Sequence, residues 1–432
     1  MDFKAKFECR EAAIGVLGLG YVGLPLAVEF ADAGFEVVGV DVNEEKVAQV
    51  NAGQNYIRDV EDGRLNRLVS EGKLRATTSY DVIRTLDAVS ICVPTPLSKS
   101  REPDITHIIH ACNEISPRMH RPMLIVLEST SYPGTTQDLV LPLLSKSGLS
   151  VGKDFFLAFS PERVDPGNPT YSTRNTPKII GGITPRCVEV ACALYSQAVE
   201  NLVPVSSAMA AEMVKLLENT FRAINIGAIN EMAIICHQLG VDVWEIIEAA
   251  KTKPFGFMPF YPGPGLGGHC IPIDPLYLSW KMRKLNYQTR FIELADKVNS
   301  AMPRYVVERI VELLNQRRIP INGARILILG VAYKRDIDDT RESPALSVIE
   351  QLLELEGEVT YNDPYVPLLS VNGVEMKCAE LSAELLAQQD LVVVTTDHSC
   401  YEWDFIVEHS RLLLDTRNGV GTRGSDGKVV KL

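Results

Sequence analysis

The motif GLGYVG at residues 18–23 constrains this 432-residue chain more than any other segment. A short apolar run leads into the motif, and a helical pattern follows over residues 24–33. A second apolar run, residues 36–40, then ends in Asp41. This is the glycine fingerprint of dinucleotide-binding domains in its strand–turn–helix–strand setting. The sequence therefore predicts a Rossmann-type domain at the start of the chain.

The three glycines of the motif have separate predicted roles. Gly18 allows the tight turn, Gly20 lets the backbone approach a pyrophosphate, and Gly23 lets the helix pack close to the strand. The helix N-terminus then presents N–H groups and its positive dipole end to the phosphates. Tyr21 and Val22, between these glycines, are predicted to contact the cofactor as well. The alternative is a glycine turn that only packs a helix.

The residues after the second strand favour NAD as the cofactor. Asp41 can accept the two hydroxyl groups of an adenosine ribose. With Glu44 and Glu45 nearby, it would repel the 2′-phosphate of NADP. Lys46 is a further predicted cofactor contact, and it leaves NADP open as an alternative.

Two more apolar runs, residues 88–93 and 124–127, each end in a hydroxyl-rich turn. Ligands of open α/β sheets bind beyond the carboxyl ends of the strands. Thr95 and Thr130 are therefore predicted to line the cofactor cleft. Ordinary turn chemistry is the alternative for both threonines.

The C-terminal part of the chain repeats the same pattern. The corresponding segments are residues 325–330, 358–363, 390–396 and 411–416. This half lacks the glycine fingerprint, because Gly330 is followed by Val-Ala-Tyr-Lys. We expect it to bind a mononucleotide moiety rather than a dinucleotide.

A helical region separates the two halves. Residues 208–250 have helical spacing interrupted at Gly240, and residues 292–317 form a second helical stretch, broken or kinked near Pro303. The predicted fold is α/β, with two Rossmann-like doubly wound parallel sheets joined by a central helical domain. The predicted domains are residues 1–204 for NAD, 205–318 for the helices and a catalytic cysteine loop, and 319–432 for a nucleotide-bearing substrate.

Composition and charge narrow the cellular setting. The chain has 55 acidic and 43 basic residues and a net charge of -12, which argues against a general nucleic-acid or anionic-membrane surface. No apolar run is long enough for a membrane span, and the N-terminus has no secretory pattern. Nine cysteines without CxxC pairs favour free thiols. We expect a cytoplasmic protein.

Cys270 ends a loop of glycines and prolines, residues 262–270. The glycines free the backbone to wrap a ligand and leave the thiol accessible, which predicts a nucleophile. An inert buried cysteine is the alternative, and it suits Cys92, Cys112, Cys192 and Cys236 better. A thiol needs a cation or a helix N-terminus to ionise near neutral pH, and Lys215 is a candidate for that cation.

Lys215, Asn219 and Arg222 occupy one face of the predicted helix at i, i+4 and i+7. Neighbouring apolar residues are expected to enclose Lys215 in part; these are Met213, Leu216, Leu217 and Phe221. A solvated polar face is the alternative.

Two charged segments follow predicted strands. Glu162 and Arg163 come after an apolar run, and Glu162 is placed as a base or a water-orienting carboxylate. Residues 333–344 contain Lys334 and Arg341, at a strand end where a phosphate or cofactor would bind, with a solvated charge cluster as the alternative. His107 and His110 have half of a metal-site spacing, but without partners they are read as surface histidines, and no metal is predicted.

Five motifs together resemble those of UDP-sugar 6-dehydrogenases, in the same order and over nearly the whole chain. They are GLGYVG, SPERVDPG, KLLENTFR, GPGLGGHCIPIDP and YKRDIDDTRESPA. His269 and Asp274-Pro275 are similar to the N-acetylhexosamine branch of that family. Residues 255–262 are similar to UDP-N-acetylglucosamine enzymes in particular.

The resemblance implies a four-electron oxidation of a UDP-N-acetylhexosamine at C6 with two NAD, through a thiohemiacetal and a thioester on Cys270. It implies Lys215, Asn219 and Asp274 as polar partners of the thiol, and Glu162 and Thr130 for water and proton transfer. It also assigns Arg341 to the cofactor. The implied substrate contacts are Glu162, Arg163, Lys215, Asn219, Arg222, Tyr261, Gly267 and Lys334. A homodimer that makes a bacterial surface-glycan precursor is the further expectation.

Alternatives to this function remain at the sequence level. The same chemistry could act on UDP-N-acetylmannosamine, UDP-N-acetylgalactosamine or UDP-glucose. A two-electron β-hydroxyacid dehydrogenase would share the Rossmann domain, the helices and a lysine, but it requires neither Cys270 nor a second α/β domain. A non-catalytic protein that senses NAD and nucleotide sugars is the third interpretation.

Overall fold

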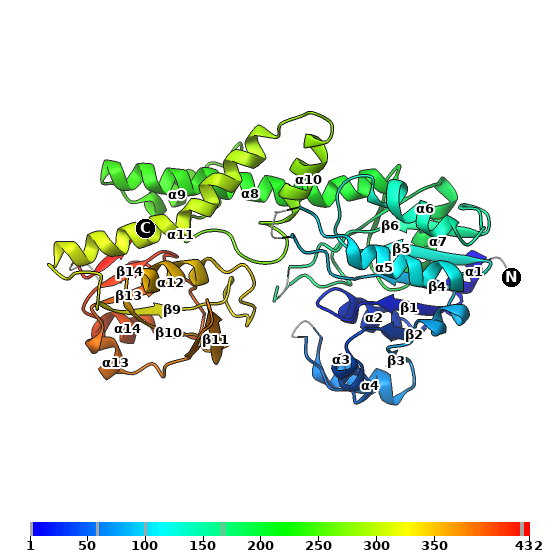
Figure 1. The fold of residues 1–432 in the computed structure, drawn as a ribbon, viewed down its shortest axis with the longest axis horizontal. Helices are drawn as coiled ribbons and strands as arrows, with labels where there is room; N and C mark the ends of the chain where they lie inside the picture. The colour runs from blue at the N-terminus through cyan, green and yellow to red at the C-terminus, as the bar shows by residue number, and fades with distance from the viewer. Residues whose placement is uncertain (1–2, 58–59, 99–101, 166, 169, 424–426) are drawn as a thin grey trace. The chain divides into compact units, whose positions relative to one another are not determined.

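The computed structural model describes residues 3–57, 60–98, 102–165, 167–168, 170–423 and 427–432 (Figure 1). The chain divides into two compact units. The N-terminal unit comprises Met1–Glu218 and Leu276–Tyr287, and the C-terminal unit comprises Asn219–Pro275 and Gln288–Leu432. Among the described residues, no helix is both long and apolar enough to cross a membrane.

The N-terminal unit is built on an eight-stranded sheet in the order β3-β2-β1-β4-β5-β6-β7-β8. The strands are β1 Ala13–Leu17, β2 Glu36–Val40, β3 Leu74–Thr77, β4 Ala88–Ile91, β5 Met123–Leu127, β6 Phe155–Phe159, β7 Lys178–Gly182 and β8 Leu202–Pro204. All pairs are parallel except β6 with β7. The predicted parallel sheet is therefore confirmed except between β6 and β7, which are antiparallel. A parallel connection needs a crossover, usually a helix, and the described part of residues 160–177 forms none.

Helices cover both faces of this sheet (Figure 1). They are α1 Phe3–Glu8, α2 Gly23–Asp32, α3 Glu44–Asn51, α4 Asp62–Ser70, α5 Thr106–Ile115, α6 Leu141–Ser145 and α7 Pro185–Tyr195. Side chains of β5 alternate between two buried apolar clusters, with Leu124 and Val126 in one and Ile125 and Leu127 in the other. The first cluster includes residues of α2 and α7, and the second includes residues of α5. The predicted doubly wound fold is confirmed.

The C-terminal unit has a five-stranded, wholly parallel sheet in the order β10-β9-β13-β14-β15. The strands are β9 Arg325–Leu329, β10 Glu358–Asn362, β13 Leu391–Val394, β14 Leu413–Asp415 and β15 Val429–Lys431, and β11 Leu368–Val371 pairs with β12 Val374–Lys377 in a hairpin. Helices α12 Pro344–Glu354, α13 Ala383–Gln388 and α14 Trp403–His409 complete the unit.

The predicted internal repeat is visible in the hydrogen bonds after β2 and β10. Asp41 follows β2, and its Oδ2 accepts the backbone N–H of Leu19 at 2.8 Å. Asp363 follows β10, and its Oδ2 accepts the N–H groups of Val331 and Ala332 at 2.7 and 3.0 Å. In each half, a carboxylate after the second strand thus holds the turn that follows the first strand.

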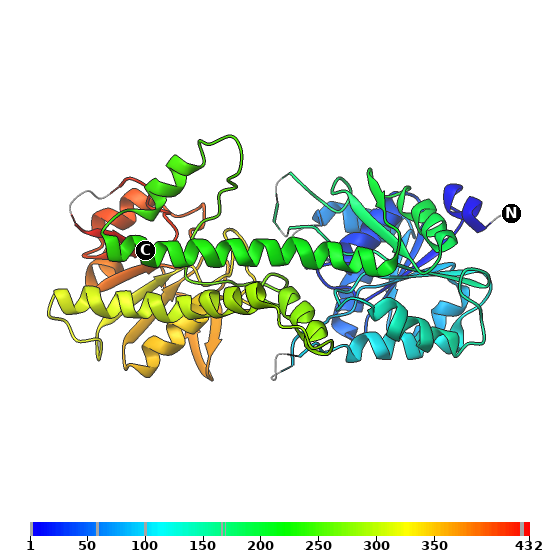
Figure 2. The same ribbon diagram turned by 90° about the horizontal axis from the view of Figure 1, so that it is seen from above.

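Four helices come from the predicted helical region: α8 Ala208–Leu239, α9 Val243–Ala250, α10 Asp274–Arg283 and α11 Arg290–Gln316. Helix α8 runs unbroken for 32 residues (Figure 2) and stops before Gly240, whose φ is +70°. Of the predicted break or kink near Pro303, the break is wrong, because α11 continues through that residue. Pro303 is buried between Met302 and Val306, so packing outweighs the cost of about 3 kcal/mol for proline inside a helix.

Candidate active site

The surroundings of the three glycines after β1 agree with the roles that the motif predicts for them. Gly18 has φ +90°, and a Cβ there would lie 2.6 Å from the carbonyl oxygen of Cys92. A Cβ on Gly23 would lie 1.8 Å from the carbonyl oxygen of Gly18. At Gly20, by contrast, no described atom comes within 4 Å of a Cβ position. Packing therefore explains the first and third glycines, whereas the open space at Gly20 fits a ligand that approaches the backbone.

The turn continues into the start of α2 through Tyr21, which is 41% exposed, and Val22, which caps the helix. On the other side, Asp41 Oδ1 accepts the N–H of Asn43 at 2.9 Å. Asn43 in turn accepts the backbone N–H of Lys46 at 3.1 Å and so caps α3. These residues fit a dinucleotide, with the Asp41 carboxylate placed to accept ribose hydroxyl groups.

Asp41→Ala is expected to raise the Kd for NAD by about 10- to 100-fold, since hydrogen bonds to a charged acceptor contribute roughly 1.5–3 kcal/mol. Titration calorimetry with NAD measures the change, and thermal unfolding checks that the variant is folded. Glu44→Ala removes an exposed carboxylate from the same segment and serves as the matched control. An unaltered Kd in Asp41→Ala would remove this residue from the cofactor site.

Two threonines lie beyond the carboxyl ends of neighbouring strands. Thr95, after β4, is buried, and its carbonyl oxygen accepts the hydroxyl of Tyr277. Thr130, after β5, is partly exposed, and the preceding Ser129 donates to the carbonyl oxygen of Val93 at 2.7 Å. Both threonines thus stand at the edge of the sheet where the sequence predicts the cofactor cleft.

Glu162 is partly buried just beyond β6, and its side chain is held from two directions. Oε1 accepts the backbone N–H groups of Arg163 and Val164 at 2.7 and 2.8 Å. Oε2 lies 3.7 Å from Nζ of Lys178. Burial alone would raise the pKa of Glu162, but the cations of Lys178 and Lys215 and the two N–H groups hold that pKa below its usual range. Glu162 is therefore an ionised carboxylate whose side chain is only 12% exposed.

Arg163 points away from this carboxylate. Its guanidinium pairs with Glu218 of α8 at 3.1 and 2.5 Å and donates to the carbonyl oxygen of Pro177 at 2.6 Å. Its charge is thus shared with a protein carboxylate. Arg163 fixes the loop after β6 beside α8.

The three residues predicted to share one face of α8 differ in their solvent exposure. Lys215 is 7% exposed, Asn219 is partly exposed and Arg222 is exposed. The solvated-face interpretation therefore fails for Lys215. Two of the residues expected to enclose this lysine, Leu217 and Phe221, are themselves exposed, at 65% and 48%, so that part of the prediction is wrong.

Two glycines before Cys270 allow close packing against another part of the chain. A Cβ on Gly267 would lie 2.6 Å from Cβ of Tyr333, and one on Gly268 would lie 2.7 Å from its ring. The N–H of Gly268 donates to the carbonyl oxygen of Arg341 at 3.2 Å. These two glycines therefore let the cysteine loop pack closely against residues 333–341.

Cys270 lies in the turn that leads into α10, four residues before Asp274. Its carbonyl oxygen accepts the N–H groups of Ile273 and Asp274 at 3.0 and 2.8 Å. Burial raises the pKa of Cys92 and raises the pKa of Cys112 to about 12, so those two thiols stay protonated.

Asp274, the first residue of α10, joins the cysteine loop to α8. It is 2% exposed, and its Oδ2 accepts Nδ2 of Asn219 at 2.5 Å. The structure thus brings Asn219 and Asp274 together, four residues from Cys270.

The remaining predicted contacts lie in the C-terminal unit. Lys334 is partly exposed. Arg341 is exposed and forms a bidentate ion pair with Asp339, with nitrogen–oxygen distances of 2.6 to 3.0 Å. The hydroxyl of Tyr261 donates to Glu248 at 3.0 Å. Its ring stacks on Trp244 with 6.0 Å between ring centroids.

Arg417 is a candidate that the sequence analysis missed. It follows β14 and donates from Nε to the carbonyl oxygen of Thr395 at 3.0 Å, and a Cβ on Gly263 would lie 2.6 Å from its Nη1. Burial and the nearby Arg335 lower the pKa of Arg417 to about 10. No described carboxylate forms an ion pair with it, and a partly buried guanidinium at strand ends suits a phosphate. Its position directly after the strand pattern was the available signal.

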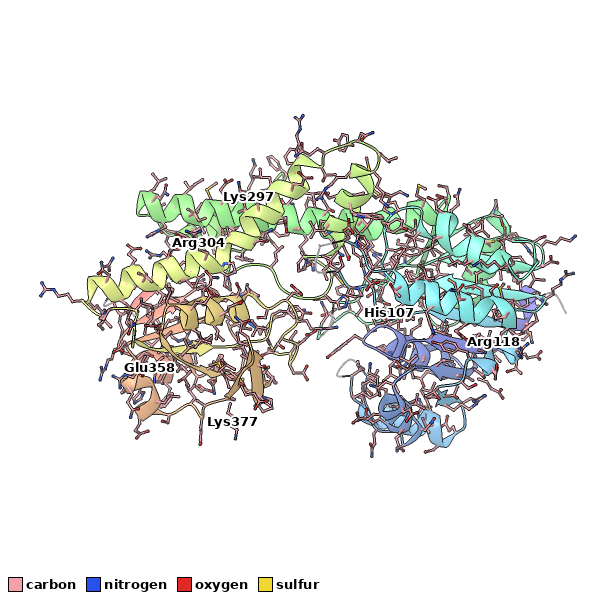
Figure 3. The ribbon with its side chains drawn as sticks, in the orientation of Figure 1. His107, Arg118, Lys297, Arg304, Glu358 and Lys377 are labelled. Carbon is pink, nitrogen blue, oxygen red and sulfur yellow. The ribbon has the colours of Figure 1, made fainter. Side chains whose placement is uncertain are left out.

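Within the described ranges, no group of three histidine, cysteine or acidic side chains could hold a metal ion. His107, labelled in Figure 3, is exposed on α5. His110, one turn further along the same helix, is exposed too, in keeping with its interpretation as a surface histidine.

Comparison with known proteins places three consecutive family domains on the chain. Residues 12–199 match the NAD binding domain of the UDP-glucose/GDP-mannose dehydrogenase family. Residues 209–301 match its central domain, and residues 327–422 match its UDP binding domain.

Individual relatives are similar over most of their length. The UDP-N-acetyl-D-mannosamine dehydrogenase of Pyrococcus horikoshii is 38% identical, with 94% of this chain and 95% of the relative aligned. The UDP-N-acetyl-D-glucosamine 6-dehydrogenase of Pseudomonas aeruginosa is 35% identical over 83% of this chain and 84% of the relative. The solved structure of UDP-D-ManNAc dehydrogenase from Pyrococcus horikoshii superposes with a TM-score of 0.89 at 35% identity, covering 97% and 98% of the two chains.

Proposed function

Since this chain belongs to the UDP-glucose/GDP-mannose dehydrogenase family and is an NAD-dependent UDP-sugar dehydrogenase, we propose that it oxidises UDP-N-acetylglucosamine at C6 to the uronate. The observation that carries the chemistry is the position of Cys270. It ends a loop packed on Tyr333, precedes the N-terminus of α10, and lies four residues from the Asn219–Asp274 pair.

Cys270 makes the second oxidation feasible. An aldehyde at C6 has no hydride to give until a nucleophile adds to it, and addition of the thiolate creates a thiohemiacetal that does. Loss of that hydride leaves a thioester, which water hydrolyses to the carboxylate and the free thiol. Bound NAD supplies the hydride acceptor for each oxidation.

The other residues handle charge and protons around C6. Lys215 and Asn219 stabilise the alkoxide and the tetrahedral oxyanions by donating hydrogen bonds. Thr130 orients water and Glu162 accepts its proton, which suits a carboxylate that is ionised and largely shielded from solvent. Asp274 holds Asn219 in its donating orientation.

Binding roles follow from the two α/β halves. Residues 18–23, Asp41, Lys46 and Thr95 hold NAD, with Arg341 as a further cofactor contact. Lys334 and Arg417 bind the UDP moiety, because both are cations that follow strands of the C-terminal sheet. Arg163, Arg222, Tyr261 and Gly267 complete the substrate contacts.

The choice of N-acetylglucosamine is supported by residues 255–262, which are similar to enzymes that act on this sugar, whereas His269 and Asp274-Pro275 support an N-acetylhexosamine in general. The relative from Pseudomonas aeruginosa carries that activity in its name. The relative from Pyrococcus horikoshii is named for N-acetylmannosamine, an epimer at C2. UDP-N-acetylmannosamine is therefore the second candidate.

The test is the amount of NADH formed per sugar consumed, with limiting UDP-N-acetylglucosamine and excess NAD. We expect two NADH per sugar and a uronate product identified by mass spectrometry. One NADH per sugar would indicate a two-electron dehydrogenase and would remove Cys270 from the mechanism. Turnover of UDP-N-acetylmannosamine, UDP-N-acetylgalactosamine or UDP-glucose in place of the first sugar would correct the substrate and retain the chemistry.

A further inference from the structure

A buried ionic cluster lies next to Glu162 in the N-terminal unit. The mechanism proposed above does not use this cluster. It consists of Glu128, which follows β5, Lys178 at the start of β7, and Tyr195 at the end of α7. Nζ of Lys178 donates to Oε2 of Glu128 at 2.7 Å and lies 3.7 Å from Oε2 of Glu162. The side chains of Glu128 and Lys178 are 0% and 5% exposed.

The second oxygen of Glu128 is also occupied. Oε1 accepts the hydroxyl of Tyr195, and that hydroxyl lies 3.1 Å from Oγ of Ser90 on β4. Nζ of Lys178 lies 5.4 Å from the centroid of the Tyr195 ring. The lysine is thus fixed by a carboxylate and an aromatic ring that do not reach the solvent.

The ammonium group of Lys178 lies near two carboxylates, at different distances. Lys178 forms a hydrogen-bonded pair with Glu128 but only a longer-range ion pair with Glu162, whose Oε2 is buried and has no hydrogen-bond partner. An orphaned oxygen on a buried carboxylate is costly and is retained where the group has a task. That oxygen faces the same cation that Glu128 holds in place.

We propose that Glu128 and Lys178 are positioning residues that set the ionisation of Glu162, so that this carboxylate accepts a proton from the hydrolytic water only above a defined pH. The inference rests on the proposed role of Glu162. The carboxylate of Glu128 restrains the ammonium of Lys178, and its negative charge limits how far that ammonium can favour the ionised form of Glu162.

Every described element around Glu162 contributes a charged or titratable group. These groups are Lys178 from β7, Lys215 from α8, Glu128 after β5, Tyr195 from α7 and Cys92 after β4. Burial raises the pKa of Cys92 and of Tyr195, so both are neutral near pH 7. Lys178, Lys215 and Glu128 are therefore the charges that act on Glu162.

The experiment is the pH profile of kcat for uronate formation in two single variants. Lys178→Met removes the cation, so we expect the acid limb to move up by about 1 to 3 pH units. Glu128→Gln removes a negative charge, so Glu162 becomes the only carboxylate of the cluster that interacts with Lys178. We therefore expect the acid limb to move to lower pH. Opposite shifts support the proposal, because a merely structural pair would move both profiles in one direction. Shifts of the same sign, or no shift, would overturn it.

Two further variants separate charge from folding. Lys178→Arg keeps the cation and is expected to restore the wild-type acid limb to within about half a pH unit. Lys6→Met breaks another lysine–carboxylate pair of the same unit, with Asp87 at 2.6 Å, and is expected to leave the limb unmoved. An arginine variant that behaves like Lys178→Met would refute the role of the cation.

A measurement of stability, which needs no enzymatic turnover, tests this inference independently of the proposed function. The melting temperature is measured against pH in the wild type and in Lys178→Met, each with and without Glu162→Gln. In the wild type, the stabilisation from Glu162 is present above its unfolded pKa and is lost as the pH falls, because its folded pKa is lowered. Lys178→Met removes one of the two cations that lower this pKa, so we expect a smaller loss of stabilisation as the pH falls. If no sugar is oxidised but the loss is smaller in Lys178→Met, the proposed function fails and the positioning pair stands; a loss as large as in the wild type overturns the pair.

Discussion

Cys270→Ser is expected to reduce uronate formation by at least roughly 10³-fold, since removal of a covalent nucleophile costs several orders of magnitude. A serine hydroxyl at the start of α10 has no thiolate-like form near neutral pH, so it adds poorly to the C6 aldehyde. The thioester cannot form. The first oxidation does not require the thiol, and the variant should retain reversible two-electron chemistry at C6.

The measurement is a single-turnover assay that follows NADH and identifies the sugar product. Cys270→Ser should give at most one NADH per sugar, with an aldehyde that a carbonyl reagent captures. Cys9→Ser removes an exposed thiol from the N-terminal unit and controls for the general effect of losing a cysteine. Steady production of two NADH by Cys270→Ser would rule out the covalent route.

Lys215→Ala is the second large effect, with hydride transfer expected to slow by about 10²- to 10³-fold. Lys215 is buried on α8, where a hydrogen bond to a developing alkoxide is stronger than in water. The same cation favours the ionised form of Glu162, so the variant should also lose part of the hydrolytic step. The two effects share one residue and will not add independently.

Stopped-flow NADH formation at saturating NAD and sugar isolates the first hydride transfer. Lys297→Ala, which removes an exposed lysine from α11 (Figure 3), is the matched control. Thermal unfolding of both variants should remain close to that of the wild type. A normal hydride-transfer rate in a folded Lys215→Ala would return this lysine to a structural role.

Local patterns predicted most of the α/β fold. The strand after the helix of the glycine fingerprint is β2, and the four strands inferred for the C-terminal half are β9, β10, β13 and β14. Each is a short apolar run bounded by turn residues, which is a local property of the sequence. The reversal at β7 and the unbroken α11 escaped prediction, because the first depends on a missing crossover and the second on burial of Pro303.

Some residues of the candidate site could likewise be predicted from local sequence patterns, and others could not. Residues inside motifs, such as Gly18, Asp41 and Cys270, could be selected from spacing alone. Arg417 could not, because it is of interest as a partly buried guanidinium without a paired carboxylate among the described residues, which only tertiary structure reveals. Glu128 and Lys178 are separated by 50 residues and meet only because β5 and β7 lie in one sheet. The packing role of Gly267 and Gly268 could not be predicted either, because these glycines contact Tyr333, which is distant in sequence.

The two hydrogen bonds of Asp41 limit how the cofactor preference of this enzyme can be redesigned. Its carboxylate holds Leu19 inside the glycine turn and Asn43 at the start of α3, besides its proposed role in binding the ribose. A substitution that admits a 2′-phosphate by removing this charge also releases the turn that receives the pyrophosphate. Engineering toward NADP therefore has to supply a new acceptor for the N–H of Leu19 at the same time as a cation for the phosphate.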